Sequence, residues 1–145
     1  MGRRRSQAGQ AARVPQTQSG VNGVTLDAGG LIALDRADRR VIALLARAAE
    51  LGARVTVPAT ALAQALRSPQ AQARLSRLVR QPGTRLVALD GPDATQVGML
   101  LAASGSADIV DAHVVICARR HAEAIVTSDP SDLRMLDPNA ELIVV

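Results

Sequence analysis

The sequence contains no phenylalanine, tyrosine or tryptophan and no lysine, so all 17 of its basic residues are arginines. Without aromatic rings the chain cannot bind nucleic acid by stacking bases on its side chains. Any bound nucleic acid would have to be held by arginine side chains, backbone amides and metal ions.

Cysteine and long apolar runs are also scarce. The single Cys117 excludes an intramolecular disulfide and fits a reducing compartment. It lies in an apolar segment, where we expect it to pack in the core. No apolar run approaches the roughly 18–20 residues that a membrane span needs, and the arginines near the N-terminus are not followed by the apolar stretch of a secretory signal. The expectation is a cytoplasmic protein without a membrane segment.

The net charge of +4 comes from one end of the chain. Residues 1–22 contain four arginines and no acid, whereas the remainder carries 13 arginines and 13 acids. The first segment is rich in Gln, Ser, Gly and Arg, which predicts a disordered basic arm followed by one domain over residues 23–145. Such an arm is either a solvated leader or a source of sequence-independent attraction to phosphates.

Short apolar segments alternate with helical patterns along the domain. We predict strands at 24–26, 55–57, 86–88, 124–127 and 142–145. We predict helices at 31–34 after a tight turn at Ala28-Gly29-Gly30, at 38–51, behind Pro58, at 68–79, at 92–103 and from about Ala107. This alternation favours an α/β fold whose parallel sheet of four to five short strands is covered on both faces.

Acidic residues recur where predicted strands end and helices begin. Asp27 follows the first strand and Asp129 follows the strand 124–127, while Asp108 and Asp111 occupy the first turn of an almost entirely apolar helix. A helix between parallel strands runs antiparallel to them, so its N-terminus lies at the carboxyl edge of the sheet, where ligands bind in such folds. Gln64, in the helix after the second strand, should lie near the same edge.

Aspartates without accompanying His or Cys clusters suit hard cations such as Mg²⁺ or Mn²⁺. One or two such ions can polarise a phosphate and activate a water, which is the chemistry of phosphodiester hydrolysis.

Some acids also have structural explanations. Asp129-Pro130-Ser131-Asp132 is a good helix start, and an acid at position 108 favours the helix dipole. We expect Asp35, Asp38, Asp90 and Asp93 to be loop acids and caps, and His113 and His121 to be structural or surface residues.

In these segments the chain resembles PIN domains, most of all the VapC-type toxin ribonucleases of bacterial toxin–antitoxin pairs. The resemblance covers roughly 24–145. It is carried by the order and spacing of Val24-Thr25-Leu26-Asp27-Ala28-Gly29, Val57-Pro58-Ala59, Asp108-Ile109-Val110-Asp111-Ala112 and Val126-Thr127-Ser128-Asp129-Pro130-Ser131-Asp132-Leu133. It implies a three-layer α/β/α fold, a Mg²⁺- or Mn²⁺-dependent endoribonuclease acting on RNA, frequent homodimers and inhibition by an antitoxin protein.

The resemblance also assigns roles. Asp27, Asp111 and Asp129 would be catalytic metal ligands supported by Asp108, and a metal-activated water would attack the phosphodiester. Asp132 matches an acid often found beside them, and Thr127 or Ser128 would orient a water or a carboxylate.

At position 64 this chain has Gln where the family commonly has Glu, which removes a charge. This leaves an alternative, a catalytically weak or inactive PIN-like module that binds RNA or a partner protein. Two other classes fit less well, because the chain lacks both the lysine that phospho-acceptor receiver domains share and the glycine-rich turn of dinucleotide-binding folds.

Overall fold

The computed structural model describes residues 16–17, 20–21, 23–66 and 72–145. Within the predicted basic arm it describes two short strands, β1 (Gln16–Thr17) and β2 (Gly20–Val21), which pair antiparallel. The rest of that arm lies outside the described residues, and so does the predicted helix start at Ser68-Pro69. The disorder expected for residues 1–22 therefore stays a prediction.

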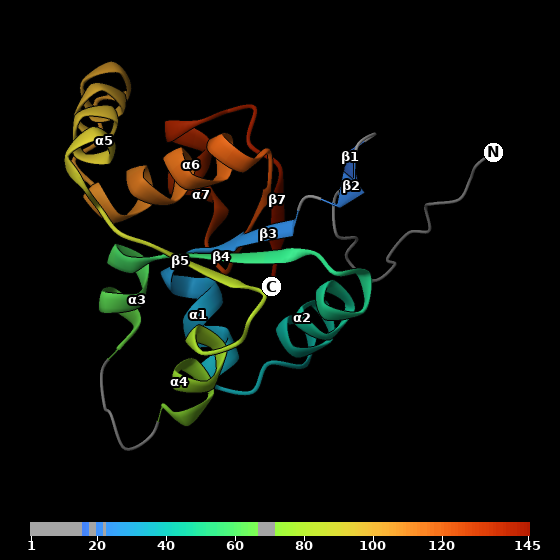
Figure 1. The fold of residues 1–145 in the computed structure, drawn as a ribbon. Coiled ribbons are helices and arrows are strands. Elements are labelled where there is room, and N and C mark those ends of the chain that lie inside the picture. Colours follow the sequence, from blue (N-terminus) through green and yellow to red (C-terminus); the bar gives the residue numbers. More distant parts are fainter. Residues whose placement is uncertain (1–15, 18–19, 22, 67–71) are drawn as a thin grey trace.

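A five-stranded parallel sheet forms the centre of the domain (Figure 1). Its strands are β3 (Gly23–Leu26), β4 (Arg54–Pro58), β5 (Thr84–Val87), β6 (Ala124–Thr127) and β7 (Leu142–Val144). They lie in the order β5-β4-β3-β6-β7, and every neighbouring pair is parallel. The strand order reverses at β3, so the carboxyl ends of β3 and β6 border the crevice where ligands bind in open parallel sheets.

Helices cover both faces of this sheet (Figure 1). One layer contains α1 (Ala28–Asp35), α2 (Arg39–Leu51), α3 (Ala59–Ala65) and α4 (Ala73–Val79). The other contains α6 (Ile109–His121), with α5 (Gly91–Ser104) and α7 (Pro130–Leu136) packed beside it. The predicted three-layer α/β/α arrangement is confirmed.

Helix α6 is buried along most of its length, as its sequence predicts. All residues from Ala112 to Ala118 are buried between the sheet and the neighbouring helices. Within the described residues no single helix is long and apolar enough to cross a membrane, and only α5 and α6 taken together, bent by 110°, meet that test.

Local sequence signals set most helix boundaries. The carboxylates of Asp38, Asp90 and Asp108 accept backbone N–H groups in the first turns of α2, α5 and α6. Gly52 and Gly105 end α2 and α5 with positive φ angles, a conformation that glycine adopts without steric penalty. The Asp129-Pro130 pair begins α7, the helix start that the sequence offers.

Two predicted boundaries are wrong. The Ala28-Gly29-Gly30 segment is the first turn of α1 and not a separate turn, because the Asp27 carboxylate caps the helix there. The third main strand spans Thr84–Val87 instead of 86–88, since its first residue pairs beside Val55. Helix α4 spans Ala73–Val79 and ends where the sequence predicts, whereas its predicted start at residue 68 lies outside the described residues.

Candidate functional site

Asp27 is placed by the turn between β3 and α1. Its Oδ1 atom accepts a hydrogen bond of 2.7 Å from the backbone N–H of Gly30, and the residue is only 5% exposed. Burial raises the pKa of Asp27, an effect that the Thr127 hydroxyl and the Gly30 N–H oppose and that the charge of Asp129 reinforces. Asp27 is thus a buried carboxylate that has hydrogen-bond donors but, among the described residues, no arginine paired with it.

The two glycines after Asp27 let α1 approach β6 closely. A Cβ atom on Gly30 would lie 2.6 Å from the backbone carbonyl oxygen of Val126, and one on Gly29 would lie 2.3 Å from Ser128 Oγ. The Val126 carbonyl also accepts a 3.2 Å hydrogen bond from the Asp27 N–H. Glycine at these positions therefore brings the ends of β3 and β6 together, and with them Asp27 and the segment that contains Asp129.

The first turn of α6 contributes the next two acids. Asp108 caps the helix by accepting a 2.9 Å hydrogen bond from the Asp111 N–H. Burial, together with the charges of Asp108, Asp27 and Asp132, raises the pKa of Asp111 to about 7. Carboxylates from β3, α6 and α7 thus repel one another at this edge, because like charges at close range disfavour ionisation.

The segment after β6 supplies the remaining predicted residues. The backbone N–H of Asp129 donates a 3.0 Å hydrogen bond to Thr127 Oγ1, and Asp129 Oδ1 accepts one of 2.9 Å from the Ser131 hydroxyl. Asp129, Asp132 and Ser128 are exposed, whereas Thr127 is fully buried beneath them. Asp129 is therefore both a cap for α7 and an acid that faces solvent beside Asp27.

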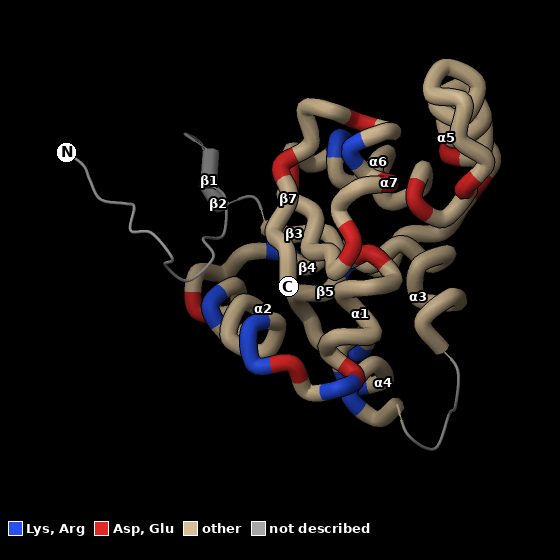
Figure 2. Tube along the Cα trace, turned by 180° about the vertical axis from the view of Figure 1, so that it is seen from behind, with Lys and Arg blue, Asp and Glu red and all other residues tan. Residues whose placement is uncertain are grey.

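We call these five carboxylates the acidic rim; its members are Asp27, Asp108, Asp111, Asp129 and Asp132. Figure 2 shows acidic segments gathered where α1, α6 and α7 meet, while arginines lie on α2, on α4 and in the last turn of α6. Gln64 is exposed on α3, the helix that follows β4 at the same edge. No arginine is paired with a rim carboxylate within the described residues.

Two solved structures share this architecture. No protein-family model and no curated protein sequence matches the chain. The crystal structure of VapBC2 from Rickettsia felis, bound to a DNA fragment from its promoter, contains a chain that is 14% identical, with a TM-score of 0.60 over 84% of this chain and 98% of that one. FitAcB from Neisseria gonorrhoeae is 18% identical, with a TM-score of 0.57 over 83% and 96%. The fold is PIN-like.

The donor set at the carboxyl edge of this PIN-like fold fits a hard cation. The rim offers only oxygen atoms, which are the ligands that Mg²⁺ and Mn²⁺ prefer. The pKa values of Asp27 and Asp111 are raised by burial and by neighbouring carboxylates, a cost that a bound cation would reduce. The rim acids are not tightly clustered: in the described ranges, three ligand atoms within 4.8 Å of one another occur only in Asp93, His113 and Cys117. Mg²⁺ commonly keeps several waters, so a cation can be held by few direct ligands.

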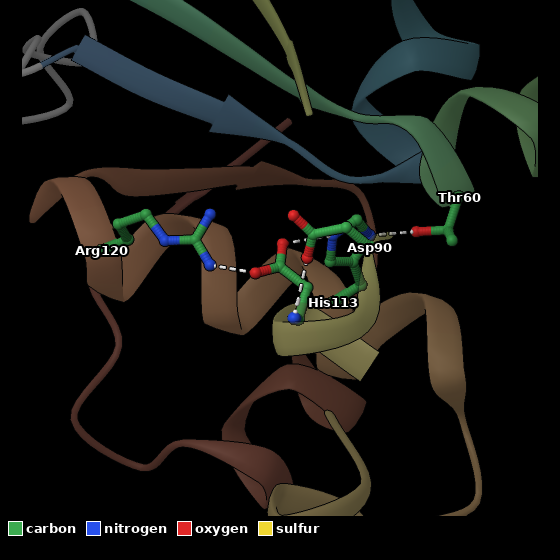
Figure 3. Close-up of polar contacts among 5 residues, drawn as sticks. Thr60, Asp90, His113 and Arg120 are labelled. Atoms are coloured by element: carbon green, nitrogen blue, oxygen red, sulfur yellow. Dashed lines mark hydrogen bonds and ion pairs between the residues drawn. The ribbon is translucent and has the colours of Figure 1, made fainter. Parts of the chain in front are cut away.

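A second polar cluster lies under the opposite half of α6, and sequence reasoning missed it. Asp93 was expected to be a loop acid or cap, but it is 4% exposed inside α5 and paired with two α6 side chains. Its Oδ1 accepts a short hydrogen bond from Arg120, and its Oδ2 lies 3.3 Å from His113 Nε2. Thr60 Oγ1 of α3 lies 2.7 Å from His113 Nδ1 (Figure 3).

We call this set the α5–α6 network: Thr60, Asp93, His113 and Arg120. Although burial alone would raise the pKa of Asp93, its hydrogen bond and charge interaction with Arg120 and its contacts with His113 lower it overall. The sequence signal that could have indicated this network was the spacing of His113 and Arg120. They are seven residues, or about two helical turns, apart and therefore lie on one face of α6. His113, expected to be structural or at the surface, is fully buried and hydrogen-bonded at both ring nitrogens.

Proposed function

We propose that this protein is a Mg²⁺- or Mn²⁺-dependent endoribonuclease that hydrolyses RNA phosphodiesters. The observation that supports this most is the acidic rim, in which carboxylates with raised pKa values lie at the carboxyl edge of a PIN-like sheet without an arginine partner. Structural acids are normally paired or solvated, because an uncompensated buried charge is costly. A bound divalent cation would remove that cost.

In this proposal Asp27, Asp111 and Asp129 hold the cation, and Asp108 supports them. When bound, Mg²⁺ or Mn²⁺ supplies Lewis acidity toward a phosphate oxygen and lowers the pKa of a water. Asp27 is kept in place by the Gly30 N–H, and Asp129 by its hydrogen bonds with Thr127 and Ser131. Gln64 and Ser128 are the further side chains proposed to orient a water, and Asp132 adds negative charge.

The raised pKa of Asp111 couples cation binding to proton release. With a pKa of about 7, Asp111 is partly protonated near neutral pH in the cation-free protein. Binding of a divalent ion favours the charged carboxylate, so that proton leaves when the ion arrives. The proposed site therefore binds its cation more tightly as the pH rises through 7.

Partners and location belong to the same proposal. VapBC2 and FitAcB are toxin–antitoxin complexes, which supports a toxin that is held inactive by an antitoxin protein. The same resemblance supports a homodimer, and the single buried Cys117 fits a cytoplasmic protein.

Cleavage of a structured RNA by the purified chain in Mn²⁺ tests the proposal. We expect Asp27→Asn and Asp111→Asn each to lower the rate by at least about 100-fold, because each removes a ligand charge from the site. Asp38→Asn is the matched control, since Asp38 is an acid that caps α2 outside the rim and asparagine caps helices equally well. A wild-type rate that persists in both rim variants contradicts the proposal.

The second candidate function is a PIN-like module that binds RNA or a partner protein without cleaving it. The presence of Gln64 where the resembling family commonly has Glu favours it, because the site then has one ligand charge fewer. RNA binding by the wild type that is unchanged in Asp27→Asn and accompanied by no Mn²⁺-dependent cleavage would establish this candidate and exclude the nuclease.

A further inference from the structure

The α5–α6 network adjoins the single cysteine of the chain. Asp93, His113 and Cys117 each offer one ligand atom, and these atoms all lie within 4.8 Å of one another. Asp93 is 4% exposed, and His113 and Cys117 are fully buried. His113 and Cys117 are four residues apart, so they share one face of α6, and α5 supplies Asp93 from the opposite side. Oxygen, nitrogen and sulfur donors therefore converge at one point between two helices.

The separation of the nitrogen and oxygen donors matches a tetrahedral metal site, and Cys117 offers its ligand atom within 4.8 Å of both. His113 Nε2 and Asp93 Oδ2 are 3.3 Å apart. Two ligands with bonds of about 2.0–2.1 Å to Zn²⁺ in tetrahedral geometry lie about 3.3 Å from each other. The same distance is long for a hydrogen bond between an imidazole and a carboxylate, which is usually about 2.7–2.9 Å when charge-assisted.

Thr60 holds the imidazole ring in the orientation that such a site needs. Its Oγ1 lies 2.7 Å from His113 Nδ1, so Nδ1 is occupied and Nε2 faces Asp93 (Figure 3). Metal-binding histidines typically donate their second ring N–H to an oxygen acceptor in this way. A threonine hydroxyl both donates and accepts, so it serves His113 whichever ring nitrogen carries the proton.

Charge and access are also compatible with a cation. Arg120 binds Asp93 Oδ1 and leaves Oδ2 on the side of His113. The Arg120 side chain is 41% exposed, so the residue that pairs with the buried Asp93 extends from the cluster to the surface. Burial raises the pKa of the Cys117 thiol to about 12. Without a metal the thiol is therefore protonated, and any thiolate signal at neutral pH reports a bound metal.

We propose that Asp93, His113 and Cys117 form a binding site for a borderline or soft divalent ion of the Zn²⁺ class, separate from the acidic rim. On binding, the ion bonds to Asp93 Oδ2, His113 Nε2 and Cys117 Sγ. The thiol proton goes to solvent, and the single imidazole proton resides on Nδ1, where Thr60 Oγ1 accepts it. The bound ion would link α5 to α6. This proposal does not depend on the proposed nuclease function.

Cobalt binding to the purified full-length chain tests this site, because Co²⁺ replaces Zn²⁺ in tetrahedral sites and a Co²⁺–thiolate bond absorbs in the near ultraviolet. We expect this absorption to saturate at one Co²⁺ per chain and to disappear when Zn²⁺ is added. Cys117→Ser, which keeps the size of the side chain, should abolish it. Asp27→Asn should retain it fully, which separates this site from the rim. Absence of the thiolate band in the wild type, or its persistence in Cys117→Ser, overturns the proposal.

Thermal unfolding supplies an independent readout. A ligand that binds only the folded state raises the unfolding temperature, and we expect saturating Zn²⁺ to raise it by about 5 °C in the wild type. The increase should vanish in Cys117→Ser and in Asp93→Asn and remain in Asp27→Asn. An equal increase in the wild type and in Cys117→Ser would place the Zn²⁺ elsewhere and contradict the assignment.

Discussion

The acidic rim and the α5–α6 network use the same residue type in opposite ways. Asp93 in the network is almost completely buried, yet its pKa is lowered, because the charge and hydrogen bonds of Arg120 and His113 outweigh the effect of burial. Asp111 at the rim is less buried, yet its pKa is raised to about 7 by burial and by three neighbouring carboxylates. The charges and hydrogen-bond donors around a carboxylate, more than its degree of burial, decide whether its ionised form is stabilised.

The two regions therefore differ in how their carboxylates are compensated when no cation is bound. A carboxylate with cationic and hydrogen-bonding partners in the protein, as Asp93 has in Arg120 and His113, stabilises the folded state without a cation. A group of carboxylates that repel one another destabilises the fold, and such groups persist where they bind something. The comparison therefore predicts opposite responses to the same kind of substitution in the two regions.

The largest effect on stability is expected for Asp93→Ala. Removing the carboxylate leaves His113 and Arg120 without their common acceptor, and we expect a loss of about 2–3 kcal/mol in the free energy of unfolding. This loss is smaller than the loss expected for a fully buried ion pair, because the half-exposed Arg120 side chain can be solvated once Asp93 is removed. Urea denaturation in the presence of a chelator measures it. At the rim, Asp111→Asn should instead raise the free energy of unfolding by about 1 kcal/mol after allowance for solvent screening. If Asp111→Asn destabilises the protein as much as Asp93→Ala does, the proposed difference between the two regions is wrong.

The next largest effect on stability is expected where α1 approaches β6 closely, next to Asp27. Gly30→Ala would place a Cβ atom 2.6 Å from the Val126 carbonyl oxygen. Because the Cβ position is fixed by the backbone of α1 and the oxygen belongs to the backbone of β6, neither atom can rotate away. The helix must therefore shift from β6, and we expect a loss of about 2 kcal/mol together with weaker Mn²⁺ binding. Chemical denaturation and calorimetry measure the two effects.

Gly98→Ala is the matched control for that substitution. Gly98 lies in the exposed part of α5 with nothing near its would-be Cβ, so alanine should stabilise by about 0.5–1 kcal/mol. Similar losses in the two variants would show that the contact with β6 does not explain the glycine at position 30.

The pH dependence of stability should differ between the cation-free and cation-bound protein. Asp27 and Asp111 have folded-state pKa values above their unfolded values, so the folded state binds more protons and stability falls as the pH rises. For Asp111 the window runs from about pH 4 to about 7, and we expect a fall of about 1–2 kcal/mol across it, discounted for partial exposure. Glu123, whose pKa burial also raises, acts in the same direction, whereas His121, whose pKa burial lowers, acts in the opposite direction below its ordinary pKa of about 6.5. Asp93 and Asp38, whose pKa values are lowered, act mainly below that window.

Denaturation midpoints measured from pH 4 to 8 check this expectation. Saturating Mg²⁺ should flatten the profile, and Asp111→Asn should reduce the slope without added metal. A cation-free wild type whose stability increases from pH 4 to 7 would show that the rim carboxylates do not repel one another as described.

The smallest expected effect is that of Gln64→Glu. Restoring a carboxylate on α3 adds one ligand charge, and we expect Mn²⁺ to bind about tenfold more tightly, which corresponds to about 1.4 kcal/mol. Calorimetric titration of wild type and variant measures the gain. Gln64→Ala controls for loss of the amide, and no gain in the glutamate variant would argue that position 64 lies away from the ion.

The architecture and the rim were accessible from sequence because both depend on order along the chain. Strands that are apolar throughout, such as 124–127, predict a buried parallel sheet, and the rule that helix N-termini face the carboxyl edge of the sheet placed Asp27 and Asp111 on one side. The same reasoning could not position Asp108 or Asp129 more finely, since each is a helix cap as well as a rim acid.

The α5–α6 network and the glycine contact required three-dimensional packing. Asp93 in isolation resembles any acid in a first helical turn, and its pairing with Arg120 arises only when α5 lies against α6. Likewise, Gly29-Gly30 indicated a turn because glycine is common in turns, whereas the structure uses it to bring a helix against the end of β6. Contacts between elements that are far apart in the sequence leave no local sequence pattern from which they could be predicted.

The position of β3 in the middle of the sheet has a consequence for local motion. Strands β5 and β7 form the two edges, and each can open without separating β3 from β6. Amide protons of the edge strands should accordingly exchange with deuterium through partial opening, while those of Thr25 and Val126 exchange only when the whole domain unfolds. The residues behind Asp27 and Asp129 thus belong to the last part of the molecule to come apart.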